Sequence, residues 1–433
     1  MILPVAFQRI ISWRPGGLAR GTLLVSLGMG VRTGIQAFVF LGIARILQTE
    51  SYGAFCAVLA LAGATGSLSG MGASMLIIRD TSRDAALFPE TWGSYLFCWS
   101  VTTPILFGLF TLVAVTCLPS AIPLSIIVAI GLAEIALVPL STASGQAFQA
   151  FGRMKDFSRL LTFPVAFRLA GVMLLIPVSY VSGDSERLLI WSVLYFVAAA
   201  CAAGYAFRQV MRHLGAPQYP AWRSIPTTMR EGFPFAVGGA ALRVYADIDK
   251  TMISSMISLE VTGFYSAGYR VMDMAAIPVT ALVETSAPRF FREGMKGKEA
   301  GFRYLCRILP VPLLYATTAA ILLYIGAGVI PLILGETYGG AVDSLRWLAW
   351  LPLFSTLRYL FQTVLGTSGH QAPAVVLVLV GALSNVALNF WMIPLWGWRG
   401  AIVATYLAEA IMMLGMWSAI AHGHLFKGAQ EQG

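Results

Sequence analysis

Long apolar stretches recur along the chain, and they constrain its fold more than any other feature. Many reach the ~20 residues that an α-helix needs to cross the hydrocarbon core of a bilayer. Charged residues make up only 11% of the 433 residues, whereas soluble domains carry about 25%. The sequence therefore predicts an all-α polytopic membrane protein. Twelve spans are expected, at 20–46, 52–78, 91–117, 122–150, 157–181, 188–211, 230–257, 260–288, 303–334, 340–367, 372–395 and 399–424.

A polar, proline-rich segment, "RHLGAPQYPAWRSIPTT", separates the first six spans from the last six. Residues 1–19 precede the first span and are basic, and they are interpreted either as a short helix on the inner membrane surface or as an unstructured leader. The predicted organisation is therefore a leader at 1–19, an N-lobe at 20–211, a linker at 212–229 and a C-lobe at 230–433.

Lysine and arginine are distributed unevenly between the two sides of the predicted bundle. Nineteen lie at the termini, in the even-numbered loops and at the span ends that flank them, and three lie in the odd-numbered loops. Loops rich in these residues stay in the cytoplasm. The asymmetry predicts that both termini and the 212–229 linker are cytoplasmic. The net charge of +9 is then a topology signal and does not require a nucleic-acid partner.

The two halves of the chain resemble each other. At an offset of 210 residues, "ESYGAFCA" at 50–57 aligns with "EVTGFYSA" at 260–267, which pairs Gly53 with Gly263 and Phe55 with Tyr265. Because six spans per half is an even number, the repeats are predicted to be parallel. Transporters built from such repeats place their substrate between the halves, near the middle of the membrane.

Three motifs, taken in order, resemble those of a known family. The segment "RVYADIDKTMISSMISLEVTGFYSAGYRVMD" is similar to the start of the second half of polysaccharide flippases. These proteins belong to the multidrug/oligosaccharidyl-lipid/polysaccharide exporter superfamily. The segment "ARILQTESYGAF" resembles the family's first turn, and "NVALNFWMIPLWGWRGAIVATYLAE" its penultimate loop.

The resemblance implies a function as well as a shape. Members move polyprenyl-diphosphate-linked oligosaccharides from the cytoplasmic to the outer leaflet of the inner membrane, through a V-shaped cavity between two six-helix lobes. Twelve spans point to the O-antigen and exopolysaccharide type. The implied partners are the lipid-linked glycan, membrane lipids and other polysaccharide assembly proteins.

Charged residues well inside the predicted spans are expensive and therefore indicate function. There are seven basic and six acidic ones: Arg32, Arg45, Arg168, Arg243, Lys250, Arg270 and Arg358, and Glu134, Asp247, Asp249, Asp273, Glu284 and Glu409. Arg243, Asp247 and Lys250 stand at helical spacing on one face of the seventh span. They are predicted to face a water-filled cavity. The residues predicted to line it are Arg32, Gln36, Arg243, Asp247, Lys250, Arg270, Asp273 and Arg358.

The sequence is compatible with other roles for these charges. Arg270 and Asp273 could form a closed internal ion pair, and Arg45 could extend to the membrane surface from its span end. Asp249 lies about 120° from the Arg243 face at 100° per residue, so it is expected to face a neighbouring helix. Asp247 and then Glu134 are the candidates for coupling transport to an ion gradient. For Glu134 and Glu409 an interhelical hydrogen bond is the alternative.

Three functions are compatible with the sequence. The first is a flippase, the second a multidrug or organic-cation antiporter of the same superfamily, and the third a scaffold of a polysaccharide assembly complex that transports nothing. Basic residues outnumber acidic ones within the first six spans, which favours an anionic cargo. No phosphate-binding loop is present, and the five cysteines stand singly. The sequence predicts no enzymatic activity, no metal and no cofactor.

Overall fold

The chain forms long helices joined by short turns, as the bilayer requires when every backbone polar group must be satisfied within the protein. The computed structural model describes residues 17–220, 222–368 and 371–421. The predicted leader helix and the basic residue Lys427 lie outside these ranges.

The first half of the chain provides the helices of the N-lobe. The first helix turns sharply at Gln48, which has a positive φ of 59°. The predicted second span is interrupted by a turn at 67–72, where Gly70 and Gly72 adopt positive φ. The elements are α2 (Gly17–Gly66), η1 (Ser69–Gly72), α3 (Ala73–Thr81), η2 (Ala85–Leu87), α4 (Phe88–Cys117), α5 (Leu124–Leu132), the π-helical segment η3 (Ala133–Leu137), α6 (Val138–Ala150), α7 (Met154–Ser179) and α8 (Asp184–His213).

The second half provides the helices of the C-lobe. Its first helix begins at Ile225, with a proline in its first turn, so the linker is shorter than predicted. The elements are α9 (Ile225–Met256), α10 (Leu259–Gly294), α11 (Lys298–Ile308), α12 (Pro310–Gly326), η4 (Ala327–Val329), α13 (Ile330–Leu334), η5 (Glu336–Tyr338), α14 (Gly339–Leu348), α15 (Leu351–Thr367), α16 (Gln371–Trp396) and α17 (Trp398–Ala421).

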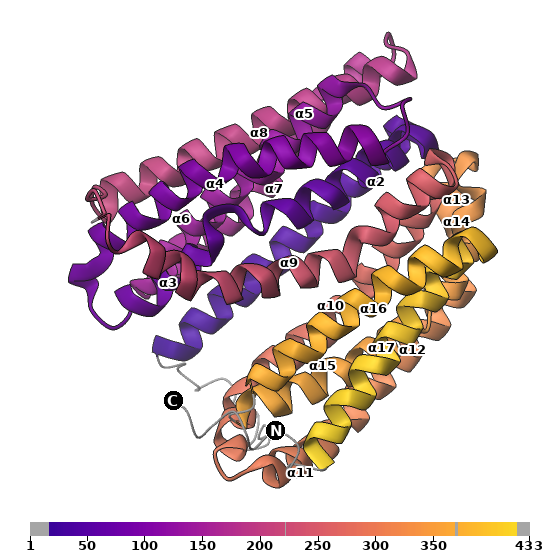
Figure 1. The fold of residues 1–433 in the computed structure, drawn as a ribbon. Helices are drawn as coiled ribbons and strands as arrows, with labels where there is room; N and C mark the ends of the chain where they lie inside the picture. The colour runs from indigo at the N-terminus through magenta and orange to yellow at the C-terminus, as the bar shows by residue number, and fades with distance from the viewer. Residues whose placement is uncertain (1–16, 221, 369–370, 422–433) are drawn as a thin grey trace, which may run out of the picture.

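This order of helices fits the twelve predicted spans. In the described ranges, eight helices are long and apolar enough to cross a membrane by length and composition alone. The two lobes meet at one end, near α13 and α14, and diverge toward the ends marked by α3 and α11, which gives the molecule the predicted V shape (Figure 1). The protein is therefore an all-α, multi-pass membrane protein.

The lobes contact each other closely where the two repeats align. A Cβ atom on Gly53 would lie 1.9 Å from the Leu259 carbonyl oxygen, and one on Gly263 would lie 1.9 Å from the Thr49 carbonyl oxygen. The repeat offset of 210 maps Gly53 onto Gly263 and Thr49 onto Leu259, so the two contacts are equivalent. This glycine pair lets the lobes meet backbone to backbone around an approximate two-fold axis.

Side chains reinforce the same junction. The Tyr338 hydroxyl donates to the Ala44 carbonyl at 2.8 Å, and Arg45 Nη1 donates to the Ile333 carbonyl at 2.9 Å. Arg45 therefore joins α2 to α13 across the lobes. Arg45 lies near a span end, as predicted, but its hydrogen-bond partner Ile333 lies 288 residues away in the chain.

Helix α9 is shared between the lobes. It crosses from the α3 side of the N-lobe to the α16 side of the C-lobe (Figure 1). Near its start, a Cβ atom on Gly232 would lie 2.3 Å from the Met71 carbonyl oxygen. An ion pair of 2.6 Å joins Arg79 of α3 to Glu231 of α9. Hydrogen bonds to Asp80 and Glu231 raise the pKa of Arg79, so this residue stays charged and the first turns of α9 stay attached to the N-lobe.

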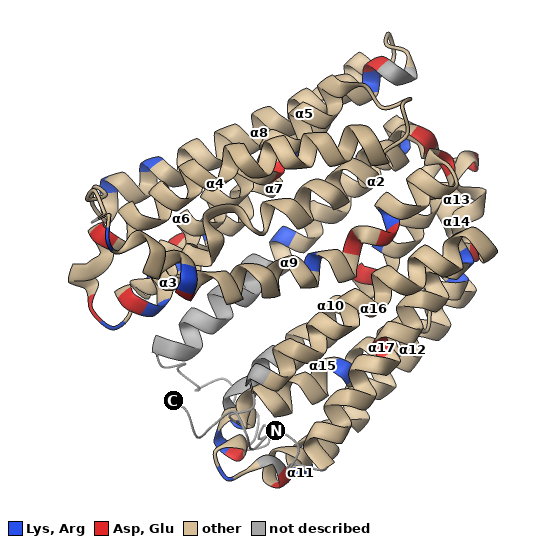
Figure 2. Cartoon of the chain, viewed as in Figure 1, with Lys and Arg blue, Asp and Glu red and all other residues tan. Residues whose placement is uncertain are grey.

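Charges concentrate at the helix ends and along the inner sides of the V, while most other helical surface is uncharged (Figure 2). Large apolar side chains such as Leu112, Leu322 and Leu383 are exposed on that surface. Exposed apolar surface of this extent is favourable in lipid and unfavourable in water. The distribution indicates that the outer faces of both lobes contact the membrane.

Candidate functional site

A cavity of about 320 Å³ lies between the lobes. Its wall is formed by α2 and η3 to α8 of the N-lobe together with α9 and α10. The charged residues of the described wall are Arg32, Glu134, Arg168, Arg243, Asp247, Lys250, Arg270 and Asp273. A smaller space of about 240 Å³ adjoins it between α2 and α10 and shares Gln36, Arg270 and Asp273. Seven of the eight predicted lining residues therefore meet at one cavity, and their role in binding stays a prediction.

The charges of α9 form a local network on the predicted helix face. Lys250 Nζ lies 2.8 Å from Asp247 Oδ1 and also donates to the Ala246 carbonyl. Arg243 Nη1 lies 3.7 Å from the other oxygen of Asp247, and the Arg243 side chain is 55% exposed. The lysine ammonium also lies 4.3 Å above the centre of the Tyr269 ring. Lys250 is thus held by its neighbours, whereas Arg243 is available to a ligand.

Asp249 turns away from the cavity, as its position on the helix predicts. Its carboxylate is 2% exposed and accepts a hydrogen bond of 2.5 Å from the Tyr265 hydroxyl of α10. It also accepts from the Lys250 backbone N–H at 2.8 Å. Asp249 therefore joins α9 to α10, and its role is structural.

Two arginines of the cavity have no carboxylate partner. Among the described residues, neither Arg32 of α2 nor Arg270 of α10 lies within ion-pair distance of an acid, and Nε of Arg32 is buried without a hydrogen-bond partner. Asp273 likewise forms no pair with Arg270, so the closed ion pair considered for these two residues is absent. The arginines approach the cavity from opposite lobes.

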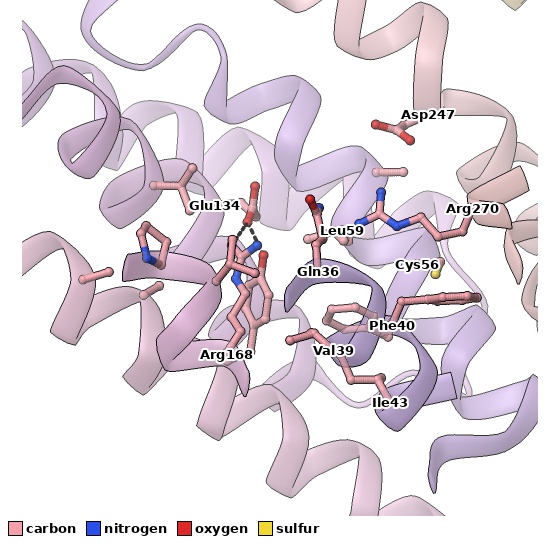
Figure 3. Close-up of a pocket in the computed structure, with 18 of the residues that line it drawn as sticks. Gln36, Val39, Phe40, Ile43, Cys56, Leu59, Glu134, Arg168, Asp247 and Arg270 are labelled. Carbon is pink, nitrogen blue, oxygen red and sulfur yellow. Dashed lines mark hydrogen bonds and ion pairs between the residues drawn. The ribbon is translucent and has the colours of Figure 1, made fainter. Parts of the chain in front are cut away.

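A second cluster lies on the N-lobe side of the cavity. Glu134 belongs to the π-helical segment η3, a kind of irregularity that is frequent at functional sites. Its Oε1 accepts a hydrogen bond from the Tyr195 hydroxyl and lies 3.5 Å from Arg168 Nη2. The Arg168 guanidinium lies 4.4 Å above the Tyr195 ring. Glu134 and Arg168 face each other on the side of the cavity opposite Asp247 and Arg270 (Figure 3).

Arg358 does not line this cavity. Its Nε lies 2.7 Å from Oε2 of Glu409, and its Nη1 donates to Gln362. Glu409 also accepts a hydrogen bond of 2.6 Å from the Tyr245 hydroxyl of α9. The Glu409 side chain is 2% exposed, so the pair is buried among α9, α15 and α17. This is the interhelical bond considered for Glu409, and it makes Arg358 a structural partner.

The cavity wall also contains polar and aromatic residues outside the predicted set, among them Arg168, Ser141, Tyr195 and Trp191. The sequence identifies Arg168 as an intramembrane charge but does not assign it to the cavity. An arginine near the middle of the predicted fifth span was the available signal for Arg168. The two aromatic residues offered no comparable signal, because aromatic side chains are common in membrane spans. In the described residues no cluster of three or more histidine, cysteine, aspartate or glutamate side chains is placed to hold a metal ion.

A match to a protein family shows to which family the chain belongs. The family described as "Polysaccharide biosynthesis protein" matches residues 18–293. The chain belongs to this family. The match covers the N-lobe, the linker and the first two helices of the C-lobe, and so includes every charged residue of the cavity wall. No curated protein matches the chain significantly.

Solved structures of transporters share the fold. The lipid II flippase MurJ, in an inward closed conformation, is 11% identical with a TM-score of 0.70, and the match covers 92% of this chain and 87% of that one. An inward-facing multidrug MATE transporter of the MOP superfamily is 11% identical with a TM-score of 0.68, covering 92% and 98%.

A third structure has the same fold. It is a MOP superfamily transporter from Pyrococcus furiosus described by the reverse polarity of its binding pocket, with 12% identity, a TM-score of 0.61 and coverage of 92% and 95%. The fold is that of MOP superfamily transporters, not of an enzyme.

Proposed function

We propose that this family member is a flippase that carries polyprenyl-diphosphate-linked oligosaccharides across the cytoplasmic membrane for O-antigen or exopolysaccharide synthesis. The family is one of polysaccharide biosynthesis, and the fold is shared with a lipid II flippase and with drug transporters. Fold alone does not distinguish an anionic from a cationic cargo. The charges of the cavity support an anionic cargo.

The observation that carries the proposal is the pair of unpartnered arginines, Arg32 and Arg270, at one cavity. Five cationic side chains face three carboxylates in the described cavity wall, a surplus of two positive charges. Arg32 lines the same cavity as Arg168, Arg243 and Arg270. Burying like charges together is unfavourable unless an anion neutralises them.

A lipid diphosphate matches this surplus. Its phosphates are negatively charged, and a guanidinium offers a phosphate two parallel charge-assisted hydrogen bonds. Arg32 and Arg270 stand on different lobes, so one diphosphate bound between them would couple its position to the angle of the V. A cation exporter would need the opposite surplus, with more carboxylates than cationic side chains facing the cavity.

The proposed cycle is alternating access. The uneven loop charge supports cytoplasmic termini, and the lobes diverge toward the side where α2 begins (Figure 1), so this conformation would be open to the cytoplasm. Asp247 and Glu134 are the proposed coupling groups. Each already pairs with a cation of the cavity wall, and an incoming anion would compete for that cation. Other polysaccharide assembly proteins remain expected partners.

The test is transport of a lipid diphosphate in reconstituted vesicles. Arg32→Ala and Arg270→Ala should each lower the initial rate about tenfold or more, because each removes a charge-assisted contact with phosphate. Arg32→Lys should recover only part of the rate, since it keeps the charge and loses the fork. Arg212→Ala is the matched control, because this exposed arginine of α8 lies outside the cavity wall.

The outcomes separate the three candidate functions. Normal lipid transport in the Arg32→Ala, Arg270→Ala double variant, at normal protein level, would contradict the anion site. Gradient-driven uptake of an organic cation that this double variant increases would support the antiporter. No transport of either cargo by the native protein would support the scaffold.

A further inference from the structure

The cavity has two chemically different sides. On one side Arg32 and Arg270 have no ion-pair partner, although Asp247, which pairs with Lys250, and Asp273 lie in the same part of the wall. On the other, Glu134, Arg168 and Ser141 offer acceptors and donors together, next to the aromatic side chains of Tyr195 and Trp191. A diphosphate finds two unpaired guanidinium groups on the first side. On the second side the one guanidinium, that of Arg168, is already paired with Glu134.

Several polar atoms on the mixed side lack a partner within the described protein. The Glu134 carboxylate accepts its hydrogen bond on Oε1, and no described residue donates a hydrogen bond to Oε2. Arg168 Nε and Trp191 Nε1 are buried without a hydrogen bond, and Trp191 is 0% exposed. The Ser141 side chain is buried and lines the same cavity. Unpaired buried polar atoms destabilise a protein unless a ligand or water satisfies them.

An unpaired indole N–H is not sufficient evidence by itself. Trp92 Nε1 is also buried without a partner, but Trp92 packs in an aromatic cluster with Phe88 and Tyr95, away from the cavity wall. What distinguishes Trp191 is that it belongs to the cavity wall, as do Glu134, Ser141 and Arg168. Phe55 and Tyr195 pack against the Trp191 ring at centroid distances of 5.9 and 6.0 Å, so the indole is fixed in orientation.

The ligand chemistry that satisfies this set is a neutral polyhydroxyl group. Each sugar hydroxyl donates one hydrogen bond and accepts others, so one sugar offers both the donor that Glu134 Oε2 needs and the acceptor that Trp191 Nε1 needs. The apolar face of a sugar ring suits an aromatic wall. A lipid tail would leave the polar atoms unpaired, and a second phosphate would be repelled by Glu134.

We propose that the N-lobe side of the cavity, formed by Glu134, Ser141, Arg168, Trp191 and Tyr195, binds the sugar that is attached directly to the diphosphate. This inference rests on the proposed function and adds an orientation to it. The diphosphate lies between Arg32 and Arg270, and the first sugar points toward η3, α7 and α8. Ser141 and Trp191 would then determine which first sugar is accepted.

The experiment compares binding of matched probes to the full-length protein in lipid nanodiscs by calorimetry. The probes are farnesyl diphosphate, farnesyl diphosphoglucose and farnesyl diphospho-N-acetylglucosamine. Ser141→Ala and Trp191→Phe should each weaken the tighter-binding sugar probe about three- to tenfold, as expected for one lost hydrogen bond. Both should leave the affinity for farnesyl diphosphate within about twofold. Trp92→Phe, which removes an equally buried indole outside the cavity wall, should change neither affinity.

Three results would overturn the sugar site: equal weakening of the bare and sugar-bearing probes, no weakening of either, or no gain in native affinity from either sugar. A melting temperature for each variant identifies loss of folding. Ser141→Ala removes a single oxygen atom, so this variant still tests the proposal if Trp191→Phe unfolds. Failure of the proposed function gives a different pattern. Binding of farnesyl diphosphate would then be unchanged in the Arg32→Ala, Arg270→Ala variant.

Discussion

Replacing Gly232 by alanine adds one methyl group at the contact between α9 and the N-lobe and so tests how closely the two pack. In Gly232→Ala the new Cβ would lie 2.3 Å from the Met71 carbonyl oxygen, whereas ordinary contact begins at 3.4 Å. The helix must therefore move by about 1 Å, and forced overpacking costs ~1–3 kcal/mol. Alanine recovers up to about 1 kcal/mol through its helix propensity. We expect a net destabilisation of roughly 1–2 kcal/mol.

Gly238 supplies the matched control on the same helix. A Cβ atom there meets nothing within 4 Å, so Gly238→Ala keeps only the propensity gain and should stabilise the protein by up to about 1 kcal/mol. The two substitutions should thus change the free energy of unfolding in opposite directions. A general effect of alanine on helices would change it in the same direction in both variants. Equilibrium unfolding in mixed detergent micelles measures both free energies.

A distance measurement shows whether the contact between α3 and the start of α9 opens. Spin labels at the exposed positions Arg83 and Phe233, in a background without native cysteines, report the separation of α3 from the start of α9. Gly232→Ala should lengthen or broaden this distance, and Gly238→Ala should leave it unchanged. Stability in Gly232→Ala equal to that of Gly238→Ala, with an unchanged distance, would refute the tight contact.

Three further predictions follow from the structure. Reporter fusions at Gly183 and Ala216 should report opposite sides of the membrane, and agreement between them would contradict the predicted topology. Asp247→Asn should weaken transport driven by an imposed proton or sodium gradient, measured as the ratio of rates with and without the gradient; an unchanged ratio would remove Asp247 from coupling. Glu409→Ala should destabilise the protein by about 3–5 kcal/mol because it leaves Arg358 charged and buried. The loss of stability, measured by unfolding in detergent, should be much smaller in the Glu409→Ala, Arg358→Met double variant. Equal losses in the two variants would show that the unpaired Arg358 charge does not cause the destabilisation.

The positions of the spans, and the helix faces on which the charges of the seventh span lie, could be predicted from the sequence. The length of apolar runs located the spans, and helical spacing placed Arg243, Asp247 and Lys250 on one face and Asp249 on another. These inferences need only the geometry of a single helix. The interruption of the second span at 67–72 was missed, because apolar residues continue through it and the left-handed glycines are the only local sign.

Contacts between helices could not be predicted in the same way. Spacing shows which residues share a face, but it does not show which helix that face meets. Arg358 was therefore assigned to the cavity, although its partner Glu409 stands 51 residues later on α17. Glu134 meets Tyr195 across 61 residues for the same reason. The missing information is the rotation of each helix about its own axis, which packing of the whole bundle determines.

The course of α9 means that the boundary between the repeats in sequence is not their boundary in space. The backbone passes from one half to the other between α8 and α9, where Gln218 donates to the Pro89 carbonyl of α4. Cutting the chain there would leave α9 in the second fragment but still seated on the first through Gly232 and Glu231. Two separately synthesised polypeptides would thus carry a built-in docking helix, and the halves could reassemble in the membrane without a covalent connection.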